Sequence, residues 1–432
     1  MKILVRPMRI MSVIAASLAI WMLLLVFGPA SVQAIGFDNR PSTENSLDLQ
    51  VRSSILIEAE SGQVLFEVNA EQAYPIASMT KLMTEYIVLE EIQNERLSWD
   101  DVITVTEEAK NTHPSESQIY LAPGDKHTVK ELYIAMAVGS ANDATKELAI
   151  QVAGSLSAFV DKMNEYAKNL GLESAVFTSV TGLEDTTVMS AADVAKLARI
   201  IILDHPEFFD FSTLQEYKFR ERDKDPIVNL NYMLGSNVNK PGLKPFAYEG
   251  VDGMKTGFIE AAGYNFTGTV KRGEIRYISV VMDTRSKNAR FVETAKLYDY
   301  AYGTFEKKTV LPPKSVIESL ETVKIKKGVK KTVPIVTDKD ITFMVKKGTD
   351  PKIELVAQEL LPEDKLIAPI EAKTPVGTVT YRYTDAETGK PIDYTVNLIT
   401  AEEAEKAGWF KLMLRAIGDF FANLFQAIVN LF

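Results

Sequence analysis

The chain has 432 residues, of which 46% are hydrophobic, so it can bury full cores in two or three domains. It contains no cysteine, which excludes a disulfide framework, a cysteine-ligated metal and a cysteine nucleophile. Its three histidines form no ligand cluster, and its formal net charge of −10 argues against a nucleic-acid partner. We therefore expect no metal, no other cofactor and no nucleic acid in its function.

The first 34 residues have the pattern of a secretory signal. Three basic residues among the first nine precede an uncharged run over residues 10–27, after which Gly28-Pro29 and small residues lead to Ala34. We expect cleavage after Ala34 and an exported mature chain. An uncleaved anchor is the alternative, because an uncharged run of 18 residues just reaches the length of a membrane span.

A β-hairpin and a helix are predicted directly after a short polar stretch. Two alternating apolar segments within residues 54–68 flank turn residues and predict the hairpin. Pro75 then precedes a helical pattern of apolar residues, which places Ser78 and Lys81 in the first turns of that helix.

The next region, up to about residue 217, is predicted to be mainly helical. Two helices within residues 129–152 meet at Ser140-Ala141-Asn142, so this Ser-x-Asn element lies on a turn. The pattern then returns to β, with strands predicted over 251–258, 265–271 and 275–283 and a closing helix over 288–304. Strands at both ends with helices between them predict one α/β domain, an antiparallel sheet with a helical insertion.

The C-terminal quarter has a different pattern. Pro312-Pro313 marks a boundary, and short β-rich runs predict a small all-β domain over residues 307–400. Residues 401–432 hold an amphipathic helix whose aromatic side and basic flanks suit an interfacial membrane anchor. A helix packed on the β domain is the alternative. The expected organisation is a signal peptide over 1–34, a catalytic domain over 35–306, then these two segments.

Three short elements carry residue types that acyl transfer requires, in the order Ser78-Met79-Thr80-Lys81, Ser140-Ala141-Asn142 and Lys255-Thr256-Gly257. Positions three apart share a helix face, so a neutral lysine could take the proton of the serine. An ordinary lysine has a pKa of about 10.4, and burial beside a second cation lowers that pKa. Lys255 could supply the second cation. The elements therefore point to a serine hydrolase without a catalytic histidine.

The specificity of this pattern lies in its order. Ser-x-Asn also occurs at Ser286-Lys287-Asn288, but that copy follows Lys-Thr-Gly instead of preceding it. The trio, together with residues 251–258 running into Ala262-Gly263-Tyr264-Asn265, resembles the D-alanyl-D-alanine carboxypeptidases among the low-molecular-weight penicillin-binding proteins. The resemblance covers nearly everything after the signal. It implies the penicillin-binding/serine β-lactamase-like transpeptidase fold, followed by a small all-β domain and a C-terminal amphipathic helix.

The resemblance also implies a two-step acyl transfer on peptidoglycan stem peptides. Ser78 attacks the carbonyl of the penultimate D-alanine, the terminal D-alanine leaves, and water releases the shortened peptide. Lys81 is the base, and Ser140 relays a proton to the leaving amine. The backbone N–H groups of Ser78 and Phe258 form the oxyanion hole.

Substrate-binding roles follow from the same match. Asn142 would bind the substrate amide, and Lys255 and Thr256 would hold the terminal carboxylate. Gly257 completes this substrate-binding element. Arg290 is a second partner for the carboxylate or, alternatively, a solvated charge.

The implied partners are stem peptides that end in D-Ala-D-Ala, β-lactam antibiotics that acylate Ser78, and the outer face of the bacterial cytoplasmic membrane, reached through residues 401–432. A DD-endopeptidase, a β-lactamase and a wall-binding protein with a dead site stay open as alternatives. The sequence departs from the family pattern at one loop, Thr181-Gly182-Leu183-Glu184. The departure leaves the shape of this loop open, and we expect it to touch none of the named chemistry.

Overall fold

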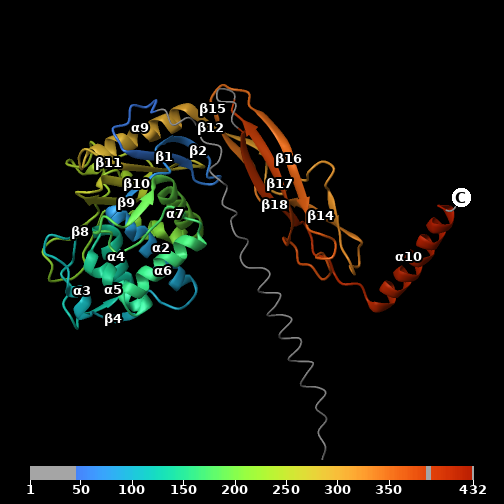
Figure 1. Ribbon diagram of the computed structural model, residues 1–432, viewed down its shortest axis with the longest axis horizontal. Coiled ribbons are helices and arrows are strands. Elements are labelled where there is room, and N and C mark those ends of the chain that lie inside the picture. Colours follow the sequence, from blue (N-terminus) through green and yellow to red (C-terminus); the bar gives the residue numbers. More distant parts are fainter. Residues whose placement is uncertain (1–44, 386–390, 431–432) are drawn as a thin grey trace, which may run out of the picture. The chain divides into compact units, whose positions relative to one another are not determined.

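The computed structural model describes residues 45–385 and 391–430. The expected signal peptide, residues 1–34, lies outside the described residues, and so does its cleavage site. The described chain contains an α/β part over residues 45–304, a β part over residues 305–400 and a C-terminal helix (Figure 1).

A five-stranded antiparallel sheet forms the centre of the α/β part, and its strand order is β2-β1-β11-β10-β9. The strands are β1 (Ser53–Glu58), β2 (Val64–Val68), β9 (Val251–Ile259), β10 (Gly263–Arg272) and β11 (Ile275–Thr284). The first hairpin and the last three strands agree with the sequence pattern. β1 pairs with β11, so segments from the two ends of the α/β part lie side by side. All helices between them are an insertion into the sheet, as predicted.

Alternate residues of the sheet are buried in two different cores. Ile55 and Ile57 of β1 belong to the core shared with the inserted helices, whereas Leu56 lies in a second core with Phe291 and Tyr298 of α9 (Ala289–Thr304). This alternation follows from the period of two in a strand. The sheet is therefore covered by α9 on one face and by the helical insertion on the other, and Figure 1 shows this layering.

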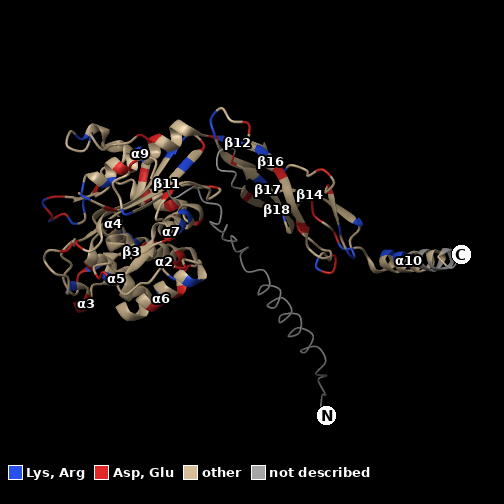
Figure 2. Cartoon of the chain, turned by 45° about the horizontal axis from the view of Figure 1, so that its top comes forward, with Lys and Arg blue, Asp and Glu red and all other residues tan. Residues whose placement is uncertain are grey.

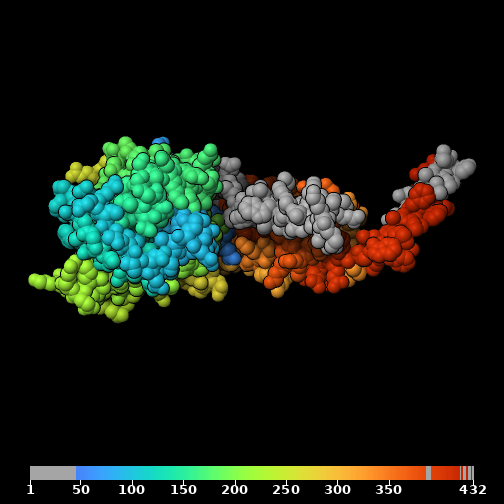
Figure 3. Space-filling model, turned by 90° about the horizontal axis from the view of Figure 1, so that it is seen from below, coloured from blue at the N-terminus to red at the C-terminus, as the bar shows by residue number. Residues whose placement is uncertain are grey.

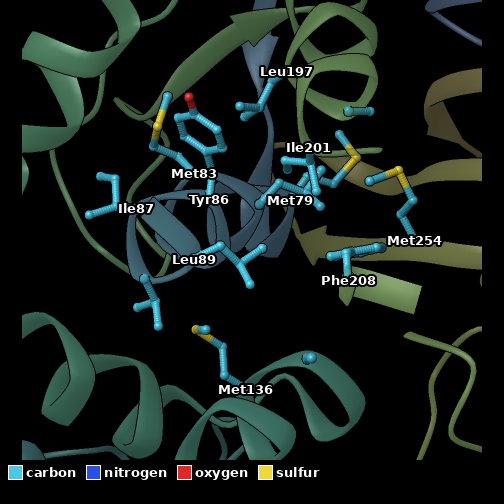
Figure 4. Packing of buried hydrophobic residues seen from close by; sticks show 14 of the residues in the cluster. Met79, Met83, Tyr86, Ile87, Leu89, Met136, Leu197, Ile201, Phe208 and Met254 are labelled. Atoms are coloured by element: carbon cyan, nitrogen blue, oxygen red, sulfur yellow. The ribbon is translucent and has the colours of Figure 1, made fainter. Parts of the chain in front are cut away.

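The helical insertion is built around α2 (Lys81–Gln93), which is buried on nearly all sides. Figure 4 shows Met83 and Tyr86 of α2 near Leu197 and Ile201 from another helix. On the face seen in the space-filling view of Figure 3, the residues of this insertion form one unbroken surface. Its other helices are α3 (Glu107–Lys110), α4 (Val129–Gly139), α5 (Asn142–Ala153), α6 (Leu156–Asn169), α7 (Ala191–Asp204) and α8 (Phe209–Ser212), with 3-10 turns η1 (Ala77–Thr80), η2 (Pro206–Phe208) and η3 (Gly235–Asn239).

Short strand pairs and caps fix the ends of these helices. Ser190 accepts a hydrogen bond from the Asp193 N–H and caps α7, and Thr128 forms a capping box with Glu131 at the start of α4. The strand pairs are β3 (Ala73–Pro75) with β6 (Val188–Ser190), β4 (Val102–Thr104) with β5 (Lys126–Thr128), and β7 (Glu216–Tyr217) with β8 (Ile227–Val228).

The β part has its own hydrophobic core, which includes Val333, Phe343 and Leu398. It contains a two-stranded sheet of β12 and β15 and a five-stranded sheet in the order β13-β14-β18-β17-β16. These strands are β12 (Phe305–Leu311), β13 (Thr322–Lys324), β14 (Thr332–Thr337), β15 (Ile341–Lys346), β16 (Lys352–Leu360), β17 (Pro375–Thr384) and β18 (Pro391–Thr400). The expected β-rich pattern is confirmed in this region.

The C-terminal helix is α10 (Trp409–Val429). Several of its large apolar side chains are exposed, among them Trp409, Phe420 and Phe425. Figure 2 shows that charged residues are frequent over the α/β and β parts. Within residues 45–385 and 391–430, no helix has both the length and the hydropathy that crossing a bilayer requires.

Candidate active site

Ser78 lies in the 3-10 turn η1, directly before α2, instead of inside an α-helical turn. The turn is closed by the Met79 N–H, 3.2 Å from the Ile76 carbonyl oxygen, and by the Thr80 hydroxyl, which donates to the Ala77 carbonyl at 2.7 Å. The neighbours Ala77 and Met79 are buried, whereas Ser78 is half-buried. The side chain of Ser78 is therefore the accessible one of this turn.

Lys81 is the first residue of α2 and is fully buried. Its Nζ lies 3.1 Å from the Ser78 Oγ and 3.0 Å from the carbonyl oxygen of Thr181. Burial, followed by the positive charge of Lys255, holds the pKa of Lys81 well below that of an ordinary lysine. The predicted pairing of Ser78 with a lysine amine that loses its proton readily is thus present in the structure.

The loop at Thr181-Gly182 packs tightly on the turn that carries Ser78. A Cβ added to Gly182, whose φ is +75°, would lie 2.0 Å from the Ala77 carbonyl oxygen. This close approach brings the Thr181 carbonyl to the Lys81 amine. The backbone of the loop is therefore a direct partner of Lys81, through a carbonyl group that any residue at position 181 would supply.

Ser140 occupies the junction between α4 and α5 in a left-handed conformation, with φ of 57°. Its side chain is buried, and its Oγ accepts a hydrogen bond from the Lys255 Nζ at 2.9 Å. Lys255 lies on β9 and also donates to the Thr256 carbonyl oxygen at 3.3 Å. The structure thus joins the second and third sequence elements through one hydrogen bond. Burial lowers the pKa of Lys255, and a nearby carboxylate offsets part of that shift.

Strand β9 lies very close to the turn of Ser78 at Gly257. A Cβ added there would lie 2.6 Å from the Ile76 carbonyl oxygen and 3.3 Å from the Ala77 Cβ. Only glycine permits this separation between β9 and η1. The glycine of Lys-Thr-Gly therefore has a steric role, and it brings the backbone at Thr256 and Phe258 to the same edge as Ser78.

Asn142 is the first residue of α5, and its side chain is buried. Its Nδ2 donates to the Glu116 Oε2 at 2.8 Å, and its backbone N–H donates to the Ser117 carbonyl oxygen at 2.7 Å. The Asn142 Oδ1 has no hydrogen-bond partner among the described residues. A buried acceptor without a partner is costly, which makes this oxygen available to a donor from outside the chain.

Arg290 lies near the start of α9 and is only 4% exposed, so its alternative interpretation as a solvated charge is wrong. Its Nη1 lies 3.5 Å from the carbonyl oxygens of Gly257 and Asn265, and its Nε has no hydrogen-bond partner in the described part of the chain. Burial lowers the pKa of Arg290 to about 10. Phe258 is half exposed and stacks on Tyr264 with ring centroids 4.2 Å apart.

Two carboxylates at the site were not foreseen from the sequence. Glu116 binds Asn142, and no motif marks the loop that carries it. Glu85 lies on α2 with only 1% of its side chain exposed. Its position seven residues after Ser78 and four after Lys81 could have indicated a charged residue on the reactive helix face.

No three His, Asp or Glu side chains are grouped as metal ligands in the described part of the chain. The chemistry that the site offers comes from the hydroxyls of Ser78 and Ser140, two buried amines, a guanidinium and unpaired polar atoms beside one strand edge. This is a set suited to attack on a carbonyl that carries a neighbouring carboxylate.

Comparisons with known proteins agree with that chemistry. The family model described as D-alanyl-D-alanine carboxypeptidase matches residues 40–286, and the model of the penicillin-binding protein 5 C-terminal domain matches residues 305–406. The carboxypeptidase DacF of Bacillus subtilis is 31% identical over 407 residues, which is 94% of this chain and 97% of the relative.

Solved structures show the same likeness. The crystal structure of penicillin-binding protein 5 from Haemophilus influenzae has a TM-score of 0.67 at 28% identity, and the match covers 85% of this chain and 99% of that one. Penicillin-binding protein D2 from Listeria monocytogenes, in its ampicillin-bound form, has a TM-score of 0.52 at 33% identity over 59% of this chain and 99% of that one.

Proposed function

Because the chain belongs to the D-alanyl-D-alanine carboxypeptidase family, we propose that it removes the terminal D-alanine from peptidoglycan stem peptides through an acyl-enzyme on Ser78. The observation that carries this proposal is the position of Lys81, whose fully buried amine lies 3.1 Å from the Ser78 hydroxyl. A buried amine without its proton is a base within hydrogen-bond reach of the nucleophile.

Acylation begins when Lys81 accepts the hydroxyl proton of Ser78. The Ser78 Oγ then forms a bond to the carbonyl carbon of the penultimate D-alanine, and the carbonyl oxygen takes up negative charge. The backbone N–H groups of Ser78 and Phe258 face this oxygen from η1 and β9. Fixed donors of this kind are worth about 3 to 4 kcal/mol of barrier each.

Collapse of the tetrahedral species breaks the bond to the terminal D-alanine, whose amine needs a proton. Ser140 is suited to deliver it, because its hydroxyl, oriented by the Lys255 ammonium, can pass its own proton to the amine while it takes up the proton that Lys81 accepted from Ser78, which leaves Lys81 neutral again. Water then attacks the ester of Ser78, with Lys81 again as base, and releases the shortened peptide.

Substrate orientation depends on groups that have unfilled bonding capacity. The unpaired Oδ1 of Asn142 can accept an N–H of the stem peptide. The terminal carboxylate is held by Lys255 and Thr256 on β9, with Gly257 allowing the close approach of the strand. Arg290 adds a buried positive charge behind this strand, with its Nε free to donate.

Mass spectrometry after labelling with a penicillin tests this assignment. We expect the label on Ser78, loss of the label in Ser78→Ala, and full labelling in Ser286→Ala, which removes the serine of the second Ser-x-Asn copy. D-Alanine release from linear stem peptides, compared with cleavage of cross-linked ones, then separates carboxypeptidase from endopeptidase action. A label on another residue of folded protein would overturn the assignment.

Outside the site, we propose that residues 35–306 form the catalytic domain, residues 307–400 the β domain and residues 401–432 a membrane anchor. The exposed aromatic side chains of α10 support the last assignment, because Trp409 is 76% and Phe425 is 68% exposed. A helix of this kind lies in the bilayer interface. The enzyme would then work outside the cytoplasmic membrane on the cell wall and would also be acylated by β-lactams.

A further inference from the structure

Glu85 is a buried carboxyl group inside the active-site helix. It lies one turn after Lys81 on α2, and positions four apart share a helix face. Its side chain is 1% exposed, and its Oε1 has no hydrogen-bond partner among the described residues. A buried carboxyl without such partners is costly unless a charge lies nearby.

The two active-site lysines supply those charges. Burial raises the pKa of Glu85 to about 7, and the positive charges of Lys255 and Lys81 keep that pKa from rising further by stabilising the ionised form. The hydrogen-bond acceptors of the two amines are neutral, since they are hydroxyl and backbone carbonyl oxygens. The carboxylate of Glu85 is therefore the buried negative charge that the hydrogen-bond acceptors of the two lysines do not supply.

Other titratable groups face this cluster from neighbouring elements. Tyr133 on α4 lies near Glu85, and its pKa is raised by burial and by the Glu85 carboxylate. Glu116 and Lys146 act on Lys81 with opposite signs, and Arg290 acts on Lys255. Lys81 and Lys255 are the charged groups that influence Glu85 itself.

We propose that Glu85 is a positioning residue whose carboxylate is the counter-charge of the lysine pair, so that Lys255 stays cationic while Lys81 is neutral. The inference rests on the proposed role of Lys81 as the base. With Lys81 neutral, the Lys255 cation and the Glu85 anion leave the buried cluster without net charge, which limits the cost of burying it. The proton that Lys81 takes from Ser78 adds one positive charge to the cluster, and this charge is lost when the proton passes to the amine of the leaving D-alanine.

The direction of the pH effect follows from the charges. The Glu85 carboxylate raises the pKa of both lysines. Removal of the Glu85 carboxylate therefore lowers the pKa of both lysines. The acidic limb of the activity profile, which requires neutral Lys81, moves to lower pH. The alkaline limb, which requires cationic Lys255, also moves to lower pH.

The test is the pH profile of kcat/KM for D-alanine release and of penicillin acylation in Glu85→Gln, measured on the full chain. We expect both limbs to move toward acid by roughly one pH unit, the size typical of losing a close opposite charge. Glu85→Asp keeps the charge, and its limbs should stay near those of the parent. If the amide variant fails to fold, Glu85→Met removes the carboxyl without burying an amide and carries the same prediction.

Glu91→Gln is the matched control. Glu91 lies on the same helix and is also buried, but its carboxylate pairs with Arg96 at 2.6 Å and Lys162 at 2.8 Å. Its loss should lower the unfolding temperature and leave both limbs in place. Unmoved limbs in Glu85→Gln, or equal shifts in Glu85→Asp, would overturn the inference. If Lys81→Ala kept the parent rate, the proposed function would fail instead, whatever the Glu85 variants showed.

Discussion

Substitution of Gly257 by alanine tests the contact between β9 and the turn of Ser78. The new Cβ would lie 2.6 Å from the Ile76 carbonyl oxygen, with the Ala77 Cβ and the Met79 Cγ both at 3.3 Å. Backbone atoms make up the shortest of these contacts, so no side-chain rotation relieves it. The strand and the turn must move apart.

The size of the effect follows from this geometry. The contact must lengthen by about 0.4 Å to reach the 3.0 Å below which real Cβ atoms are essentially never found. A displacement of about 1 Å at a reacting centre costs on the order of 100-fold in rate. We therefore expect Gly257→Ala to lose roughly 10- to 100-fold in acylation rate, with about 1 to 3 kcal/mol of stability lost to overpacking.

The assay is the second-order rate of acylation by a fluorescent penicillin, measured together with thermal unfolding. Gly303→Ala is the control, because a Cβ at Gly303 in α9 meets nothing within 4 Å. It should acylate at the parent rate. If folded Gly257→Ala acylated within twofold of the parent, the close approach of β9 to η1 would not be what places the reacting groups, and the argument from this contact would be refuted.

The remaining predictions concern charge, substrate contact and location. Lys81→Met should raise the unfolding temperature by about 2 to 4 °C per kcal/mol of stability gained. Because the pKa of Lys81 is lowered in the folded protein, the lysine must lose its proton on folding, and this cost disappears toward pH 10, where the unfolded lysine loses its proton too. The gain should therefore shrink toward pH 10, and a pH-independent gain would contradict this. Asn142→Ala should lower kcat/KM for a stem peptide by about 10- to 100-fold, the cost of losing a buried hydrogen-bonding group; an unchanged value would remove Asn142 from substrate binding. Deleting residues 401–432 should abolish flotation with anionic lipid vesicles, and equal recovery without them would exclude the anchor.

Much of the fold could be predicted because local signals were strong. Alternating apolar residues marked β1 and β2, and the return of the β pattern after residue 250 marked β9, β10 and β11. Predicting the pairing of β1 with β11 depended on recognising both strand segments and on the inference that the helices form an insertion between them.

The residues of the site could be predicted from the sequence, but their local geometry could not. Ser78 and Lys81 were placed in one helix, but the 3-10 turn depends on the contacts of η1 with β9 and the Gly182 loop, which lie far away in sequence. Glu85 and Glu116 carry no motif, and their roles depend on burial and on partners from other elements. Pattern reasoning cannot supply such long-range information.

If a neutral amine at position 81 activates Ser78, the acylation rate of Lys81→Ala must fall, and this rate is the decisive measurement. We expect a folded protein that reacts with penicillin at least 100-fold more slowly than the parent, since a positioned general base usually contributes at least this much. Acylation of Ser78 in that variant at a rate within a few-fold of the parent would contradict the claim.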